Sequence, residues 1–176
     1  MSWEFIQATS DQAKDITELV NSAYRGESSK KGWTTEADLL GGQRADMESI
    51  RTNIDKDNSV ILVAENENSG AIEGCVHLEK QEEKCYLGML TVKPTLQGKG
   101  LGKMMLEEAE AFAEFWDCKK VYMTVIGQRT ELIAWYEDKG YKNTGERKPF
   151  PYNDERFGVP KVQDLYFVIL EKKISE

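Results

Sequence analysis

The sequence predicts an α/β protein built on a mixed, mostly antiparallel sheet of about six to seven strands, with helices on both faces. Residues 60–64, 71–79 and 84–92 are strand-like and are separated only by short polar turns, so they should pair as antiparallel neighbours. The run 60–64 is apolar at every position, which is typical of a strand covered on both faces. A long amphipathic helix then leads to a strand at 121–125, and this crossover predicts a parallel pair.

The other elements follow from hydrophobic periodicity and turn residues. Apolar residues at three- and four-residue steps predict helices at 11–25, from 33–36 onward, around 47–54, at 101–116 and, capped by Thr130, at 131–139. Short β-forming runs predict strands at 3–6, at 142–145 and at 165–170, where the last one closes the sheet. Gly140 ends its helix with a Schellman-type turn, and residues 146–161 are expected to form a long irregular loop.

Composition argues against several classes of function. The chain has 176 residues, 40% hydrophobic and 31% charged, which predicts one domain over residues 1–176. A net charge of −8 argues against nucleic-acid and anionic-membrane partners, and no apolar run approaches the roughly 20 residues that span a bilayer. Three scattered cysteines, one histidine and no secretory signal predict a cytoplasmic protein without a metal site.

The stretch 87–104 carries the clearest functional signal. A strand-forming run stops at Pro94, and Gly98, Gly100 and Gly102 precede the amphipathic helix. Glycines let the backbone approach an anion, and a helix N-terminus offers unpaired N–H groups. The stretch does not fit a Walker A loop, because no Ser or Thr follows Lys103. It does not fit the dinucleotide-binding fingerprint either, because its glycines do not have the G-x-G-x-x-G spacing. The sequence predicts another kind of phosphate loop, with a plain structural turn as the alternative.

Two motifs resemble one enzyme family. Residues 97–102, Gln-Gly-Lys-Gly-Leu-Gly, closely resemble the Q/R-x-x-G-x-G/A signature of GNAT-family acetyltransferases, which bind the pyrophosphate of acetyl-CoA. Residues 135–141, Trp-Tyr-Glu-Asp-Lys-Gly-Tyr, look like the family's aromatic-Tyr-Glu-x-x-Gly-aromatic segment. The resemblance covers nearly the whole chain. It implies a GNAT-like three-layer fold with a splay between the fourth and fifth strands, and acetyl-CoA as the acetyl donor.

By this resemblance, the cofactor site combines the splay with the glycine loop. Backbone groups freed at the splay would pair with pantetheine, and loop N–H groups would meet the pyrophosphate. Lys99 and Lys103 would add long-range attraction, unless they are simply solvated. Where the family often has Asn, seven residues before its tyrosine, this chain has Arg129, which would reach the substrate or a phosphate. The cofactor-binding candidates are Leu90, Thr91, Val92, Gln97, Gly98, Lys99, Gly100, Leu101, Gly102, Lys103 and Arg129.

The catalytic candidates are Tyr136, His77 and Glu79. Tyr136 matches the family's tyrosine that faces the leaving sulfur, where a hydrogen bond would strengthen as sulfur gains charge; the alternative is a core residue. Many family members place a carboxylate on the strand before the signature, but residues 85–92 contain none. His77 and Glu79 share one face of the neighbouring strand. His77 would act as the base and Glu79 as a relay through water; the alternative is that the two side chains simply face solvent.

The acceptor site in such a fold lies among the turn between the first helices, the strand beside the cofactor groove and the last irregular loop. Here these segments supply Tyr24, Arg25, Trp33, Thr34, Glu36, Arg44, Phe150 and Tyr152. Aromatic side chains with two arginines suggest a small acceptor with an apolar part and a carboxylate. An alternative of equal weight is that Trp33 and Phe150 are packing residues and the arginines are surface charges.

Together, these features predict an N-acetyltransferase that moves an acetyl group from acetyl-CoA to a primary amine by direct attack in a ternary complex. The acceptor is expected to be a small-molecule or protein amine. The sequence leaves the oligomeric state open, with a homodimer as one alternative. The alternative from another class is a CoA-binding sensor or partner-binding module that has lost catalysis. A nucleoside triphosphate binder is disfavoured because Met104 follows Lys103.

Overall fold

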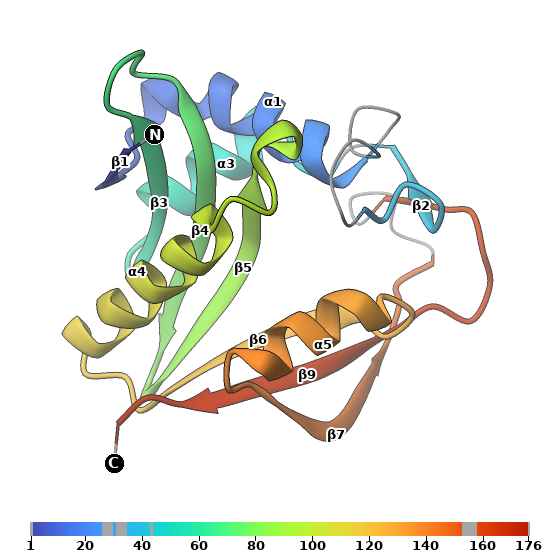
Figure 1. The fold of residues 1–176 in the computed structure, drawn as a ribbon. Helices are drawn as coiled ribbons and strands as arrows, with labels where there is room; N and C mark the ends of the chain where they lie inside the picture. The colour runs from blue at the N-terminus through green and yellow to red at the C-terminus, as the bar shows by residue number, and fades with distance from the viewer. Residues whose placement is uncertain (1, 26–29, 31–34, 43, 153–157, 176) are drawn as a thin grey trace.

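The computed structural model describes residues 2–25, 30, 35–42, 44–152 and 158–175. Within them, a seven-stranded sheet has the order β1-β3-β4-β5-β6-β9-β7 (Figure 1). Its strands are β1 (Trp3–Gln7), β3 (Ser59–Asn66), β4 (Ile72–Gln81), β5 (Lys84–Val92), β6 (Lys120–Ile126), β7 (Lys142–Pro149) and β9 (Tyr166–Lys173). Neighbouring strands are antiparallel except β5 and β6, which are parallel, and this confirms the predicted mixed sheet.

Helices cover both faces of the sheet. They are α1 (Ala13–Tyr24), α3 (Met47–Asp55), α4 (Leu101–Phe115) and α5 (Thr130–Asp138). In β3, Leu62 and Ala64 pack into the core beneath α4, whereas Ile61 and Val63 pack beneath α1 and α3. The continuous apolar run in this strand therefore reflects burial on both faces, as predicted.

The strands β5 and β6 diverge after a short parallel stretch. Residues 84–86 pair with residues 120–122, and beyond this point the two strands separate (Figure 1). A β-bulge interrupts β5 next to the opening, where Met89 has a φ of +57°. Because β5 and β6 are fourth and fifth in the sheet order, the predicted splay is confirmed.

The structure corrects two predictions near the C-terminus. The strand predicted at 165–170 does not close the sheet, because β9 lies between β6 and β7. Residues 146–149 are not irregular: they extend β7, and Pro149 is tolerated there since β7 is an edge strand. Later in the same predicted loop, β8 (Val159–Pro160) pairs with β2 (Leu40–Gly41).

Two helix predictions also change. For the helix expected from Trp33, both Trp33 and Thr34 lie outside the described residues, and the segment after them is a turn in which the N–H groups of Leu39 and Leu40 donate to the carbonyl of Glu36. The helix predicted at 131–139 begins one residue earlier, with Arg129 at its N-cap. Its predicted Schellman ending is confirmed by the bond from the Tyr141 N–H to the Tyr136 carbonyl, 3.1 Å.

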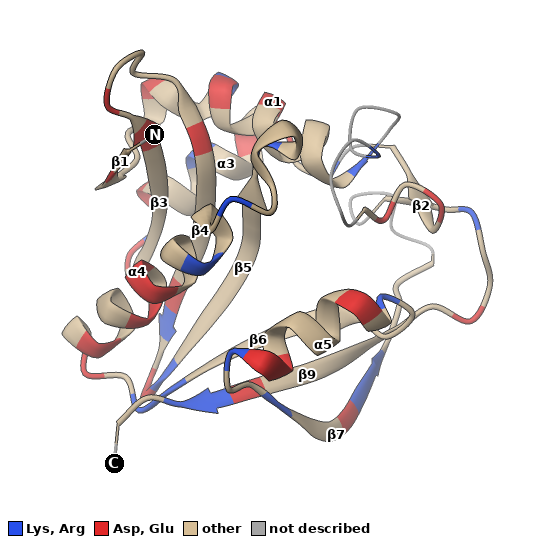
Figure 2. Cartoon of the chain, in the orientation of Figure 1, with Lys and Arg blue, Asp and Glu red and all other residues tan. Residues whose placement is uncertain are grey.

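Charge is distributed unevenly over the elements. Figure 2 shows acidic residues along α1 and the later turns of α4, with basic residues at the start of α4. Of the described helices, none is long and apolar enough to cross a membrane. Within the described part of the chain, no cluster of His, Cys, Asp and Glu is arranged to hold a metal ion.

Candidate active site

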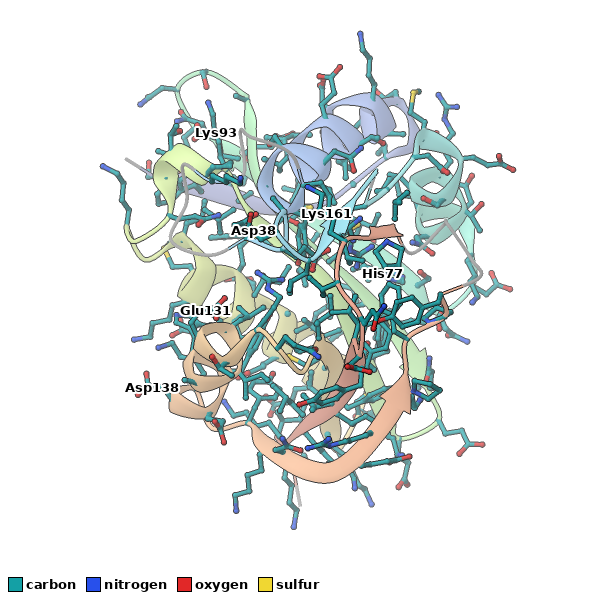
Figure 3. All side chains as sticks on the ribbon, turned by 90° about the vertical axis from the view of Figure 1, so that its right-hand side faces the viewer. Asp38, His77, Lys93, Glu131, Asp138 and Lys161 are labelled. Atoms are coloured by element: carbon teal, nitrogen blue, oxygen red, sulfur yellow. The ribbon has the colours of Figure 1, made fainter. Side chains whose placement is uncertain are left out.

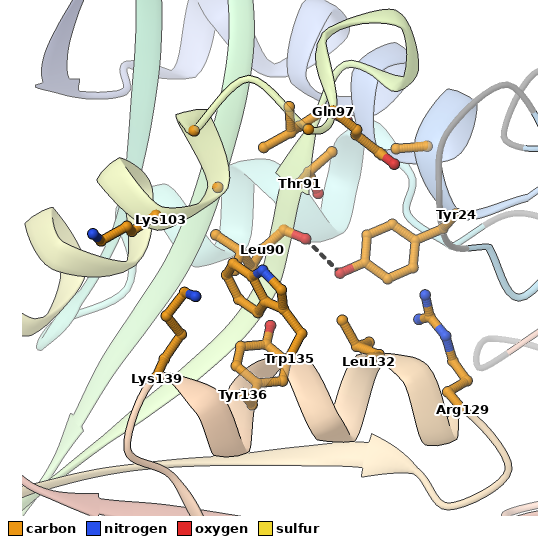
Figure 4. Close-up of a pocket in the computed structure, with 15 residues that line it drawn as sticks. Tyr24, Leu90, Thr91, Gln97, Lys103, Arg129, Leu132, Trp135, Tyr136 and Lys139 are labelled. Carbon is orange, nitrogen blue, oxygen red and sulfur yellow. Dashed lines mark hydrogen bonds between the residues drawn. The ribbon is translucent and has the colours of Figure 1, made fainter.

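A cavity of about 450 Å³ lies where β5 and β6 separate, between the start of α4 and α5 (Figure 4). Nine of the predicted cofactor-binding residues line it: Leu90, Thr91, Val92, Gln97, Gly98, Gly100, Gly102, Lys103 and Arg129. The other two do not, because Lys99 is exposed outside the cavity and the Leu101 side chain is fully buried in the core. We call this space the donor cavity.

Sequence reasoning missed four residues that line the donor cavity: Ala23, Leu132, Trp135 and Lys139. The last three lie on α5 or immediately after it, within four residues of Tyr136. A signal for them was present, since residues three and four apart share one face of a helix. The Lys139 ammonium lies 5.1 Å from the centre of the Trp135 ring, so this face combines an aromatic surface with a positive charge.

The glycine loop owes its shape to two of its three glycines. Gly98 and Gly100 have φ values of +83° and +88°, in the left-handed region that other residues rarely adopt. Gly100 is the N-cap of α4, so the unpaired N–H groups of the first helical turn follow directly. Gly102 lies inside α4, where an added Cβ would make only ordinary contact with Trp135 at 3.6 Å. The loop thus presents a helix N-terminus to the donor cavity.

A second cavity, of about 310 Å³, lies against α1, α3 and the bulged part of β5. It shares Tyr24, Leu90, Arg129, Leu132 and Tyr136 with the donor cavity. Five predicted acceptor residues line it: Tyr24, Arg25, Glu36, Arg44 and Phe150. Tyr152 does not line it; its hydroxyl accepts from the Leu165 N–H at 2.7 Å instead. We call this space the acceptor cavity.

Tyr24 lies where the two cavities meet. Its hydroxyl donates to the Leu90 carbonyl at 2.7 Å, on the splayed part of β5 (Figure 4). Its ring lies 5.3 Å from the Arg44 guanidinium and 5.8 Å from that of Arg129. Burial raises the pKa of Tyr24 despite these two cations, so the hydroxyl keeps its proton at neutral pH and acts as a donor.

Tyr136 is both a core residue and a cavity residue. Its side chain is 5% exposed and contacts Trp135 and Tyr141 edge-on, with ring centres 5.1 and 5.8 Å apart. In Figure 4 its hydroxyl points from α5 toward β5 near Leu90. Burial raises the pKa of Tyr136 far above its ordinary value, and neighbouring Tyr24 adds to this effect. The phenol therefore stays protonated and can donate a hydrogen bond in this place.

A buried ionic cluster forms one wall of the acceptor cavity. Glu36 accepts from Arg25 Nε at 2.7 Å and from an Arg129 guanidinium nitrogen at 3.1 Å. All three side chains are at most 6% exposed. Arg25 also donates to the Gly41 carbonyl at 3.2 Å, and Gly158 lies so close to the Arg25 guanidinium that a Cβ at this position would clash with it. The cluster joins the end of α1, the start of α5 and the β2–β8 pair.

The two predicted base residues, His77 and Glu79, line neither cavity. Figure 3 shows His77 well to one side of Glu131 and Asp138, which mark α5. His77 Nε2 lies 2.9 Å from Ser59 Oγ, which itself donates to the Asn53 carbonyl. The hydroxyl proton is thus used, and the network assigns the imidazole hydrogen to Nε2. The Glu79 side chain is 17% exposed and pairs with Lys56 at 2.6 Å, and the hydrogen bond from Lys56 lowers the pKa of Glu79.

His77 should make stability depend on pH. Burial lowers its pKa to about 4 from an ordinary 6.5, so the folded protein binds fewer protons than the unfolded chain between these values. Its contribution is complete above pH 6.5 and is lost as the pH falls to 4, by roughly 3 kcal/mol. We expect urea unfolding between pH 7 and pH 4 to show that the free energy of unfolding falls by roughly 3 kcal/mol more in wild type than in His77→Gln. Parallel curves would contradict the assignment.

Comparisons with known proteins agree with this geometry. Residues 14–141 match the model of the acetyltransferase (GNAT) family. A spermine/spermidine N(1)-acetyltransferase of Bacillus subtilis is 27% identical over 85 residues, 48% of this chain and 54% of that protein, so the chain spans about half the length of this curated relative.

Solved structures resemble the whole chain. A Salmonella typhimurium candidate acetyltransferase, solved with its cofactor acetyl-CoA, has a TM-score of 0.71 at 18% identity and covers 100% of this chain and 96% of that one. The ribosomal-protein-S18-alanine N-acetyltransferase of Escherichia coli has a TM-score of 0.71 at 13% identity, over 99% and 95% of the two chains. These structures share the fold, and the family model covers most of the sequence. The chain therefore belongs to the GNAT family of acetyltransferases.

Proposed function

We propose that the protein transfers an acetyl group from acetyl-CoA to a small primary amine by direct attack in a ternary complex. The observation that carries this proposal is the junction of the two cavities at Tyr24, Leu90 and Tyr136. One cavity ends in a glycine loop and a helix N-terminus, and the other is lined by aromatic and charged side chains. Two substrates can therefore meet without a covalent enzyme intermediate.

The donor cavity fits acetyl-CoA. The first turn of α4 and Lys103 would hold the pyrophosphate, since a helix N-terminus favours anions. Residues 87–92 of β5 do not pair with β6, and the backbone groups along this free edge would form hydrogen bonds with the amides of pantetheine. The thioester would then lie at the splay, near Leu90 and Tyr136. The Salmonella typhimurium neighbour with its cofactor acetyl-CoA supports the same assignment.

The chemistry is a displacement at the thioester carbonyl. The lone pair of the amine forms the new C–N bond, the C–S bond breaks, and the amine loses a proton while the thiolate gains one. Tyr136 would donate a hydrogen bond to the sulfur as charge develops, rather than transfer its proton fully, because its pKa is raised. Glu36, the one carboxylate on the described wall of the acceptor cavity, already accepts from two arginines. The proton of the amine would therefore leave through water.

The cysteines support direct attack. Cys75, Cys85 and Cys118 are buried and line neither cavity. Burial raises the pKa of Cys75 and of Cys85 to about 12, so their thiolates are scarce at neutral pH. None of them suits the role of an acyl-accepting nucleophile.

The experiment is an amine screen with acetyl-CoA, in which acetylated products are identified by mass spectrometry. We expect turnover with at least one class of small primary amine. Thermal stabilisation by acetyl-CoA without transfer to any amine would instead favour a CoA-binding sensor. Stabilisation by Mg-ATP but not by acetyl-CoA would overturn the donor assignment as well.

The glycine loop gives a separate test of the donor cavity. Gly100→Ala should weaken acetyl-CoA binding about tenfold, because a Cβ at a φ of +88° costs roughly 1 to 2 kcal/mol and the relaxed loop no longer presents the N-terminus of α4. Gly70→Ala is the matched control: Gly70 has a φ of +75° in the β3–β4 turn, with open space around its Cα. Calorimetry should show weaker binding only for Gly100→Ala, and equal affinities for both variants would rule out this role.

A further inference from the structure

We propose that the acceptor is a small primary amine that carries a carboxylate, and that Arg44 binds this carboxylate. The inference rests on the proposed amine acetylation and names the acceptor class for the same site. It is carried by the charges on the wall of the acceptor cavity and by the position of Arg44 relative to the junction with the donor cavity.

The described wall of the acceptor cavity contains three arginines, Arg25, Arg44 and Arg129, and one carboxylate, Glu36. Glu36 binds both Arg25 and Arg129, so it is already shared between two guanidinium groups. Arg44 is different: among the described residues, no carboxylate lies within ion-pair distance of its guanidinium. A half-buried cation in a cavity is stabilised when a ligand supplies the missing anion.

Arg44 is held in place from two sides. Its backbone N–H donates to the Asn21 side chain at 2.7 Å, and its guanidinium lies over the Tyr24 ring, 5.3 Å from the centre. The hydroxyl of that same ring donates to Leu90 at the junction of the cavities. A carboxylate on Arg44 would therefore lie one aromatic ring away from the junction. Asn53 also lines this cavity, and its amide is a further hydrogen-bond donor among the lining residues.

The same charges argue against a polyamine acceptor. The Arg44 guanidinium, which no described carboxylate neutralises, adds a positive charge to this wall, and a positive charge repels a polycation. The Bacillus subtilis relative is named for spermine and spermidine, so this chain would differ from it in acceptor. A volume of about 310 Å³ is at the lower end for small-molecule sites and suits an acceptor the size of an amino acid.

The test compares matched acceptors in steady-state assays with acetyl-CoA. Each L-amino acid of a panel is paired with its amide, which resembles a peptide N-terminus, and with its descarboxy amine; spermidine is added as the polycation. The enzymes are wild type, Arg44→Gln, Arg44→Lys and Arg51→Gln, the last being a control because Arg51 is exposed on α3 outside both cavities.

We expect wild type to prefer the carboxylate-bearing member of a pair at least tenfold in kcat/KM. Arg44→Gln should remove this preference by raising KM for that member about 10- to 100-fold, with little change for its amide or descarboxy amine. Arg44→Lys should restore part of the preference, and Arg51→Gln should behave as wild type. Preference for spermidine, the amide or the descarboxy amine would overturn the proposal. So would an equal loss for all members of a pair in Arg44→Gln.

A direct binding measurement separates this proposal from the proposed activity. If no amine is acetylated, the activity fails, but calorimetric titration of the amino-acid panel into the CoA complex still reports on the carboxylate site. Binding to wild type that Arg44→Gln abolishes would support the site. Absence of binding to wild type would overturn it.

Discussion

Tyr136→Phe is expected to lower kcat about 100-fold while leaving the dissociation constant of acetyl-CoA nearly unchanged. Removal of one preorganised donor to a developing negative charge typically costs this much. The phenol remains protonated because burial raises its pKa, so the hydroxyl is a donor throughout the neutral range. The ring would still fill its place between Trp135 and Tyr141 in the variant, and binding should persist.

Steady-state kinetics and calorimetry on the same preparations would check this prediction. Tyr166→Phe is a suitable control, since Tyr166 is a partly buried tyrosine that lines neither cavity. Unchanged turnover in Tyr136→Phe would remove Tyr136 from the mechanism. A loss of acetyl-CoA affinity equal to the loss in kcat would indicate a purely structural role.

Glu36→Gln is expected to lower the free energy of unfolding by about 3 to 5 kcal/mol. The carboxylate accepts from Arg25 and Arg129, and loss of one partner from a buried ionic cluster costs this much because the other charges stay buried. The same change should reduce kcat/KM for the acceptor, since the cluster forms a wall of the acceptor cavity.

Chemical denaturation would measure the first effect. Glu83→Gln is the matched control, because Glu83 also pairs with a cation, Lys119, but both side chains are more than half exposed, and an ion pair at the surface contributes about 1 kcal/mol or less. Equal costs for Glu36→Gln and Glu83→Gln would show that the buried cluster adds nothing beyond a surface ion pair.

Several features of this protein could be predicted from local sequence. Each is a property of a short segment: the period of two in a strand, the period near 3.6 in a helix, and the need for glycine at a positive φ. These periods predicted the run 60–64 between two helical layers and the helix from Leu101, whereas the splay between β5 and β6 was implied by the family resemblance. The signature at 97–102 and the segment around Tyr136 then predicted the family, which the family model confirms.

Other features could not be predicted because they depend on partners far apart in the chain. Tyr24 and Leu90 are 66 residues apart, and Glu36 and Arg129 are 93 apart, yet each pair shares a hydrogen bond. His77 looked like a base from its place on a strand, but burial and Ser59 show a neutral ring outside both cavities.

The division between sequence and structure is therefore physical. The sequence by itself determined the layers of the fold and the glycine loop, because local periodicity and backbone conformation encode them. Only the tertiary structure decided how charge is shared in the acceptor cavity, where Glu36 binds Arg25 and Arg129 but not Arg44. Charges are compensated by whatever lies near them in space, and this proximity arises only when distant segments pack together.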